Sequence, residues 1–150
     1  MDVRLATARD AGHLIAAYMK HVNPSRREGD RFARLHLTFE RCLLAEQEGM
    51  VLGGLTWGLR DDPRSGLAQL TGLLVNERVR RKGLGTLLVL LAIEDMHAFF
   101  AGRGCRLRRV FLTADQQNLP VRRMWEKLGF GAVAQLEDHV KPGRTDLIYA

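Results

Sequence analysis

Apolar and polar residues alternate in some stretches of this chain, and in others apolar residues recur every three to four positions, so strands and helices are both expected. The apolar strand at residues 67–75 and the strand at 107–114 flank a long apolar helix, an arrangement that predicts a parallel pair. The pattern predicts strands over residues 3–6, 42–46, 50–59, 67–75, 107–114, 132–140 and 145–150, and helices over 11–20, 30–41, 84–101 and 120–128. These elements describe an α/β fold, whose last two strands are expected to pair antiparallel.

Capping residues and helix breakers predict where the helices begin. Asp10 is expected to cap the helix that begins at residue 11, and Asp30 the next helix, after a charged stretch at residues 25–29. Asn118 is expected to cap the last helix, with Pro120 in its first turn.

Length and composition bound the class of protein. A chain of 150 residues that is 46% hydrophobic and 27% charged is expected to form one domain, residues 1–150, as a monomer or a homodimer. No apolar run approaches the roughly 20 residues of a membrane span, and no apolar signal segment is seen at the amino terminus, so no membrane association is expected. Cys42, Cys105 and the five histidines form no ligand pattern, which predicts a cytoplasmic protein without a bound metal.

The junction between the fourth predicted strand and the long apolar helix carries the strongest chemical signal. Basic residues at 78–82 lead into Gly83-Leu84-Gly85 at the helix start, where backbone N–H groups and glycines allow an anion to approach closely. A dinucleotide-binding fingerprint needs a third glycine at the position of Leu88, and no phosphate-binding P-loop run is present. The junction therefore predicts an anion site of another kind.

Two further arginine-rich stretches, residues 103–109 and 122–123, contribute to the net charge of +6. Basic clusters attract phosphate, whether on a nucleotide-like cofactor or on nucleic acid. We interpret these two stretches as solvated surface, because neither adjoins a glycine-rich helix start.

Two motifs resemble those of a known family. Arg80-x-x-Gly83-x-Gly85 before an apolar helix is similar to motif A of the GNAT family of N-acetyltransferases, and Asn118 followed by MWEKLGF at residues 124–130 resembles its motif B. The order and spacing of the motifs suit the family, and the resemblance covers essentially the whole chain. It implies a mixed, mostly antiparallel central sheet with helices on both faces, parallel and splayed at the central pair of strands.

The resemblance also implies a co-substrate, acetyl-CoA, with its pyrophosphate on the loop and its pantetheine along the fourth strand. Asn118 would contact the pantetheine arm or an ordered water. The acetyl group would pass, by direct attack in a ternary complex, to a primary amine of a small molecule, peptide or protein. The implied cofactor-binding residues are Leu73, Leu74, Val75, Arg80, Arg81, Lys82, Gly83, Leu84, Gly85, Thr86 and Asn118.

The residues that would move protons depart from the family's pattern. Trp125 stands where many relatives carry a tyrosine that protonates the leaving thiolate, and an indole N–H cannot act as an acid near neutral pH. Gln69 and Thr113 stand where some branches carry a glutamate base. Asp115 is the acidic residue nearest the expected acyl end, although a loop-capping role competes for it.

Two alternatives stay open beside the transferase. A CoA-binding module with weak or no transferase activity would account for Gln69, Thr113 and Trp125. A nucleic-acid-linked activity, such as acetylation of an aminoacyl-tRNA, would account for the arginine clusters. The sequence does not place four other candidates for acid–base chemistry: Glu40, Glu46, Asp138 and His139.

Overall fold

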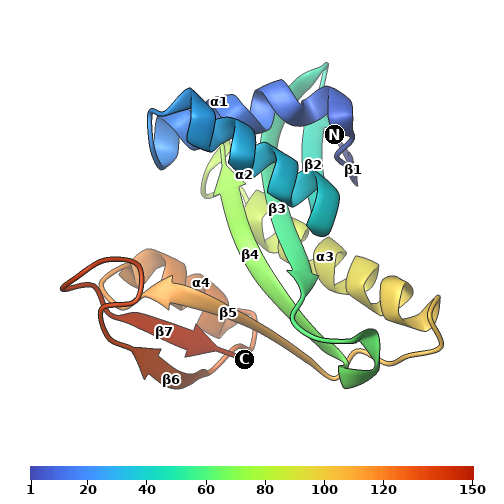
Figure 1. The fold of residues 1–150 in the computed structure, drawn as a ribbon, viewed down its shortest axis with the longest axis vertical. Helices are drawn as coiled ribbons and strands as arrows, with labels where there is room; N and C mark the ends of the chain where they lie inside the picture. The colour runs from blue at the N-terminus through green and yellow to red at the C-terminus, as the bar shows by residue number, and fades with distance from the viewer. The chain divides into compact units, whose positions relative to one another are not determined.

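The structure, a computed structural model, describes all 150 residues (Figure 1). The strands are β1 (Asp2–Leu5), β2 (Arg41–Gln47), β3 (Met50–Leu59), β4 (Leu67–Val75), β5 (Arg109–Asp115), β6 (Ala132–Leu136) and β7 (Asp146–Tyr149). The helices are α1 (Ala11–His21), α2 (Arg26–Phe39), α3 (Leu84–Ala101) and α4 (Leu119–Lys127), and short 3-10 turns occupy Ala8–Asp10, Pro63–Ser65 and Glu77–Val79.

The seven strands form a mixed sheet in the order β1-β2-β3-β4-β5-β7-β6. Its pairing is mostly antiparallel, and β4 and β5 pair in parallel from Leu67↔Arg109 to Gln69↔Phe111, which confirms the predicted parallel pair. The chain divides into two compact units. The first unit is Met1–Gly58 with Gly72–Ala92, and the second unit is Leu59–Thr71 with Ile93–Ala150.

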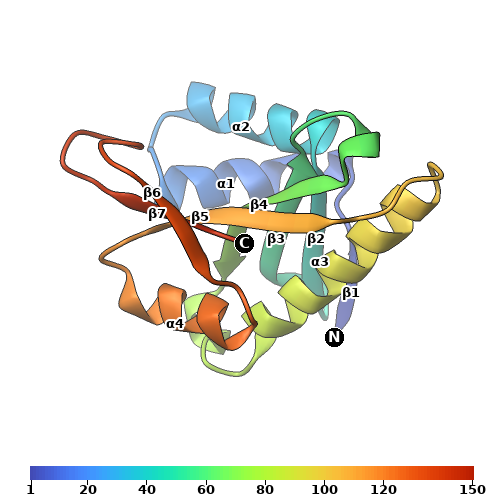
Figure 2. The ribbon, with the colours of Figure 1, turned by 90° about the horizontal axis from the view of Figure 1, so that it is seen from below.

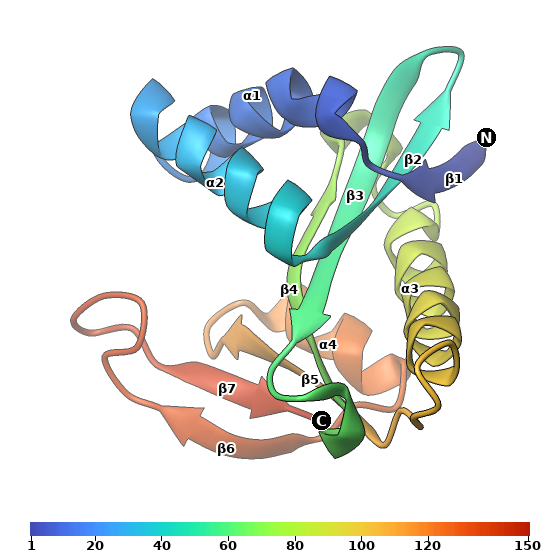
Figure 3. The ribbon, with the colours of Figure 1, turned by 45° about the vertical axis from the view of Figure 1, so that its right-hand side comes forward.

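In the first unit, helices cover both faces of the strands. Figure 3 shows α1 and α2 on one side of β2 and β3, and the start of α3 on the other. Under α1 and α2 lies a cluster of buried apolar side chains from Leu14, Ile15, Ala33, Cys42 and Leu44. On the opposite face Gly53 of β3 lets α3 come close, because a Cβ there would already lie 3.4 Å from Leu84 and from Leu88.

Helix α2 begins four residues earlier than predicted. Ser25, not Asp30, is its N-cap, and the Ser25 Oγ accepts a hydrogen bond of 3.3 Å from the Glu28 amide. Gly29 in the first turns is buried against α1, where a Cβ would lie 3.1 Å from Ile15 Cγ2. The charged stretch before Asp30 is therefore helical because its glycine allows the two helices to approach closely.

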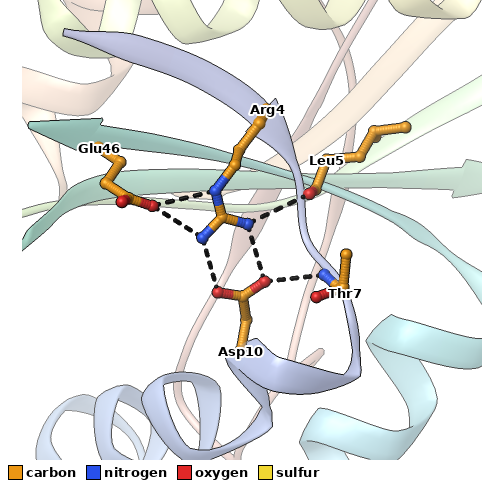
Figure 4. Close-up of polar contacts among 5 residues, drawn as sticks. All are labelled: Arg4, Leu5, Thr7, Asp10 and Glu46. Carbon is orange, nitrogen blue, oxygen red and sulfur yellow. Dashed lines mark hydrogen bonds and ion pairs between the residues drawn. The ribbon is translucent and has the colours of Figure 1, made fainter. Parts of the chain in front are cut away.

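Asp10 is the N-cap residue of α1, as predicted, but its side chain accepts no hydrogen bond from the first turn of the helix. Its carboxylate accepts a hydrogen bond of 2.8 Å from the Thr7 amide and two of 2.9 Å from Arg4, which also binds Glu46 (Figure 4). The Arg4 hydrogen bonds lower the pKa of the Asp10 carboxyl from 3.8 to about 2, against the effect of burial. Through Arg4 the network ties β1 to the turn before α1 and to β2.

Replacing Asp10 with asparagine tests the energetic weight of this network. Because the folded-state pKa is depressed, ionised Asp10 stabilises the fold above its unfolded pKa, and this stability is lost as the pH falls toward about 2. We expect Asp10→Asn to lower the free energy of unfolding in urea by about 2 kcal/mol near pH 7, and by less near about pH 3. Asp30→Asn, at an exposed ion pair on α2, is the control and should cost less than about 0.5 kcal/mol. A difference that stays constant with pH would contradict the assignment.

In the second unit, β5, β7 and β6 pair antiparallel, and Figure 2 shows α4 running beside them. Trp125 of α4 is buried and meets the ring of Phe130 edge-on, with centroids 5.7 Å apart. The fully buried Tyr149 of β7 accepts a hydrogen bond from Arg122 Nε and donates one to Glu126, so α4 is bound to β7 by polar groups as well. β5 begins at Arg109, not residue 107, and β6 ends at Leu136, not residue 140.

Helix α3 is long and apolar enough, by length and composition alone, to cross a membrane. Residues on one stripe of this helix are buried within the fold: Leu84, Leu88, Ala92, Met96 and Phe100. This stripe, spaced by four residues, packs as a core helix of a globular fold does, whereas Leu87 and Leu90 on the other side of the helix are exposed.

Candidate functional site

The loop between β4 and α3 lies in the first unit and is anchored at its beginning. The Asn76 amide donates to Leu52 O of β3 at 2.8 Å, and the Asn76 side chain accepts from the Arg78 amide at 3.0 Å. Arg80 Nε donates to Val75 O at 3.0 Å, which folds the loop back on the end of β4. These hydrogen bonds attach the loop to β3 and to the end of β4 before α3 begins.

The turn into α3 exposes backbone amides. Arg81 and Gly83 both have positive φ, 62° and 84°, and the hydrogen-bond ladder begins with Leu87 N donating to Gly83 O at 3.0 Å. The amides just before Leu87 therefore precede the ladder and face out of the helix end, where they form the positive end of the helix dipole. A Cβ on Gly83 would meet nothing within 4 Å, so open space lies over this turn.

The side chains around the turn are basic and exposed. They come from Arg78, Arg80, Arg81 and Lys82. Together with the outward-facing amides they can hold a group with several negative charges, such as a pyrophosphate. Of the residues implied by the resemblance, Leu73–Val75 and Arg80–Thr86 thus come together in the first unit.

Asn118 and Asp115 lie in the second unit, at the turn from β5 to α4. Asn118 is the N-cap of α4, as predicted, and its side chain accepts from the Val121 amide at 3.4 Å. Asp115 accepts from the Gln117 amide at 2.9 Å and lies 3.7 Å from Arg144 in an ion pair. Both contacts of Asp115 are those of a residue that stabilises a turn.

The three positions that depart from the family's pattern also lie in the second unit. Trp125 is buried against Phe130, as a core residue of α4 would be. Gln69 accepts a hydrogen bond from Arg60 Nε, and Thr113 is an exposed residue of β5. None of these side chains is an acid or base that titrates near neutral pH.

All four residues left open by the sequence have structural partners. Glu46 binds Arg4, and Asp138 accepts from the Gly143 amide at 2.7 Å. His139 Nδ1 lies 2.9 Å from the fully buried Asp146, which also accepts from Arg144 at 2.8 Å. Burial alone would raise the pKa of the Asp146 carboxyl, but these hydrogen bonds outweigh it and lower the pKa.

The fourth, Glu40, forms a pair with His36 at the end of α2. The two side chains are hydrogen-bonded through His36 Nδ1 and Glu40 Oε2, and 8% of the His36 side chain and 16% of the Glu40 side chain are exposed. The Phe32 ring packs edge-on against the His36 imidazole, with ring centroids 4.0 Å apart, and this contact restricts the orientation of the imidazole. The available signal in the sequence was the i,i+4 spacing of the two residues, which brings them close if the helix continues to its C-cap, Glu40.

The arginine-rich stretch at 103–109 is partly engaged with its own backbone. Arg103 donates to Phe99 O at 3.1 Å and stacks over the Phe99 ring, and Arg108 donates to Ser65 O at 2.8 Å. These contacts favour the interpretation of this stretch as structured surface.

A known protein family matches most of this chain. Residues 9–130 match the family model described as the acetyltransferase (GNAT) family. No curated protein sequence matches the chain significantly.

Solved structures share the fold over nearly the whole chain. An acetyltransferase of the GNAT family from Streptococcus pneumoniae superposes with a TM-score of 0.75 at 20% identity, covering 99% of this chain and 96% of its own. A ribosomal-protein-alanine N-acetyltransferase from Brucella melitensis gives 0.77 at 18%, covering 99% and 98%. An aminoglycoside 6'-N-acetyltransferase complexed with coenzyme A gives 0.77 at 14%, covering 99% and 95%.

Proposed function

Because the chain belongs to the acetyltransferase (GNAT) family, we propose that it is an N-acetyltransferase that moves an acetyl group from acetyl-CoA to a primary amine. The observation that carries this proposal is the turn into α3, where positive φ at Arg81 and Gly83 accompanies outward-facing amides and exposed basic side chains. We further propose that the two units form one acyltransferase domain, because the family match runs through both of them.

In this proposal the pyrophosphate of acetyl-CoA binds at the amides of Arg81–Thr86. Each phosphate oxygen accepts from backbone N–H groups, and the neighbouring guanidinium and ammonium groups balance the charge. The pantetheine pairs with the backbone of Leu73–Val75. These three residues of β4 are partly buried, and Gly72 before them is exposed. Asn118 contacts the pantetheine arm or an ordered water.

The reaction sets three chemical requirements. The amine must lose a proton before it attacks, since an alkylamine has a pKa of about 10.4. The oxyanion of the tetrahedral intermediate needs a donor, and we assign this to a backbone N–H of Leu73–Val75. The leaving thiolate, with a thiol pKa of about 8.5, departs without an obligatory acid, which is consistent with Trp125 in place of tyrosine.

The names of two similar solved structures indicate which classes of acceptor amine to propose. One is named for alanine of a ribosomal protein and another for an aminoglycoside, so peptide and small-molecule amines both occur among proteins of this fold. We propose a small-molecule, peptide or protein amine as acceptor, a cytoplasmic location, and a monomeric or homodimeric state.

Acetyl-CoA binding and turnover test the proposal directly. We expect acetyl-CoA to raise the melting temperature, because a ligand that binds only the folded state stabilises it. We also expect release of free CoA thiol with at least one acceptor among spermidine, kanamycin and a peptide that begins with alanine. Without amine, thiol should appear only at the rate of background hydrolysis. Absence of any binding isotherm at about millimolar acetyl-CoA would refute the function.

A second candidate is a CoA-binding module that transfers poorly or not at all. Gln69 and Thr113 favour it, because neither side chain can accept a proton as a carboxylate does. It predicts tight acetyl-CoA binding, as the main proposal does, but no thiol release above the buffer rate for any amine. The thiol-release measurement therefore distinguishes the two candidates.

A further inference from the structure

We propose that an arginine-rich surface of the second unit binds the phosphate backbone of a nucleic acid. The surface is formed by the loop after β3 and by the connection from α3 to the first residue of β5. This surface, the arginine patch, consists of Arg60, Arg64, Arg103, Arg106, Arg108 and Arg109. Both segments belong to the second unit, whereas the turn into α3 belongs to the first, so acetyl-CoA binding is not a premise.

Hydrogen bonds hold the two segments of the arginine patch side by side. Gly66 O accepts from the amides of Arg108 and Arg109 at 2.8 and 3.1 Å, and Arg108 Nε donates to Ser65 O at 2.8 Å. Figures 2 and 3 show the green turn Pro63–Ser65 next to the connection from α3 to β5. Arginines from two distant parts of the sequence are therefore neighbours on one surface.

Most of the positive charge of the arginine patch is uncompensated. The two segments contain two acidic residues, Asp61 and Asp62, of which Asp62 pairs with Arg64 at 3.0 Å. The Arg106 and Arg109 side chains are exposed and form no hydrogen bond or ion pair within the fold. Arginines in excess over acidic groups on one surface produce a positive potential that attracts polyanions.

Three of the guanidinium groups are oriented by neutral partners. Arg60 donates to the Gln69 side chain, and Arg108 donates to a backbone carbonyl as described above. Arg103 donates to Phe99 O at 3.1 Å, and its Cζ lies 3.5 Å from the centroid of the Phe99 ring. These contacts restrict the guanidinium groups without neutralising them, so less conformational entropy is lost when an anion binds.

The composition of the arginine patch favours a nucleic acid over an acidic protein. Residues 60–66 and 102–109 contain arginine but no lysine, and the planar guanidinium can donate two parallel hydrogen bonds to one phosphate. Neither segment exposes a large apolar side chain, although protein interfaces usually depend on such anchors. Nucleic-acid binding, in contrast, can take its affinity from phosphate contacts alone.

The direct test is fluorescence anisotropy of the full chain with a labelled RNA duplex of about 20 base pairs. We expect a Kd of roughly 10⁻⁶ to 10⁻⁴ M near physiological salt, the range of sequence-independent binding. The logarithm of the affinity should fall with the logarithm of the KCl concentration with a slope of about −3 to −4, as expected for about four phosphate contacts. Absence of binding at about 50 mM KCl would overturn the inference.

Single charge removals show whether the arginine patch is the surface that binds. Arg106→Gln and Arg109→Gln should each weaken binding about three- to tenfold and reduce the salt slope by about 1. Their melting temperatures should not change, because neither side chain has a partner in the fold. Arg34→Gln on α2 and Arg81→Gln at the turn into α3 remove the same charge elsewhere and should change the affinity less than about twofold. Equal losses in all four variants would overturn the inference.

Two other polyanions identify the class of partner. A DNA duplex of the same length that binds as well as RNA would support recognition of the phosphate backbone of either nucleic acid, and binding of RNA alone would support an RNA partner. Polyglutamate that binds as tightly as the duplexes would overturn the assignment to a nucleic acid in favour of an acidic protein. Failure of the chain to bind acetyl-CoA would refute the proposed function and leave this inference intact.

Discussion

Replacing Gly66 with alanine is expected to destabilise the protein by about 4 kcal/mol. Gly66 has φ of 71°, a conformation that costs an L-residue about 1–2 kcal/mol. A Cβ there would also lie 2.5 Å from Arg106 O and 2.7 Å from Arg108 Cγ. The Gly66 carbonyl accepts from the amides of Arg108 and Arg109, so the clash cannot be relieved without loosening the start of β5.

Gly49→Ala separates the backbone strain from the clash. Gly49 has a similar φ of 75° in the β2–β3 turn, but a Cβ there would meet nothing within 4 Å. It should therefore cost only about 1 kcal/mol in urea unfolding. Equal losses in the two variants would show that the close approach at Gly66 is unimportant.

Replacing Gly83 with valine is expected to weaken acetyl-CoA binding by roughly 30- to 100-fold, or about 2–3 kcal/mol. At φ of 84° a β-branched residue is strained, so the turn shifts and its amides leave the positions in which we propose that they hold the pyrophosphate. A Cβ there also enters the open space over the turn. Titration calorimetry measures the loss of affinity.

Stability distinguishes this effect from simple unfolding. A Cβ at position 83 meets no atom within 4 Å in the free protein, so the fall in melting temperature should reflect only the free-energy cost of the strained φ. Gly49→Val carries a comparable strain in the β2–β3 turn and should bind acetyl-CoA normally. Unchanged affinity in Gly83→Val would place the pyrophosphate somewhere other than this turn.

Elements with strong local signals were predicted to the residue. Strands Met50–Leu59 and Leu67–Val75 and helix Leu84–Ala101 are long apolar segments bounded by glycines or charged turns, and their ends coincide with the structure. Helix α2 differs because Gly29 weakens the local helix signal, while its packing on Ile15 and Met19 of α1 stabilises the helix in the fold. Tertiary contacts of this kind leave no local pattern.

The candidate site also has one part that could be predicted from the sequence and another that depends on the folded structure. The turn at Arg80–Thr86 was identified from a contiguous motif, because glycines and basic residues adjacent in sequence are adjacent in space. His36 lies in the last turn of α2 and Glu40 is the residue directly after the helix, but the position of Glu40 over Gly58 depends on the pairing of β2 with β3. Only the folded sheet brings that glycine beneath the carboxylate.

The two cysteines differ in their accessibility to thiol reagents. Burial in the apolar cluster raises the pKa of the Cys42 thiol to about 12, so its nucleophilic thiolate is scarce at neutral pH. Cys105, after the end of α3, is partly exposed and donates only to Arg103 O. We therefore expect thiol reagents to label the chain at one position, Cys105. In a colorimetric assay of released CoA, the Cys105 thiol would add a background of one thiol per protein chain.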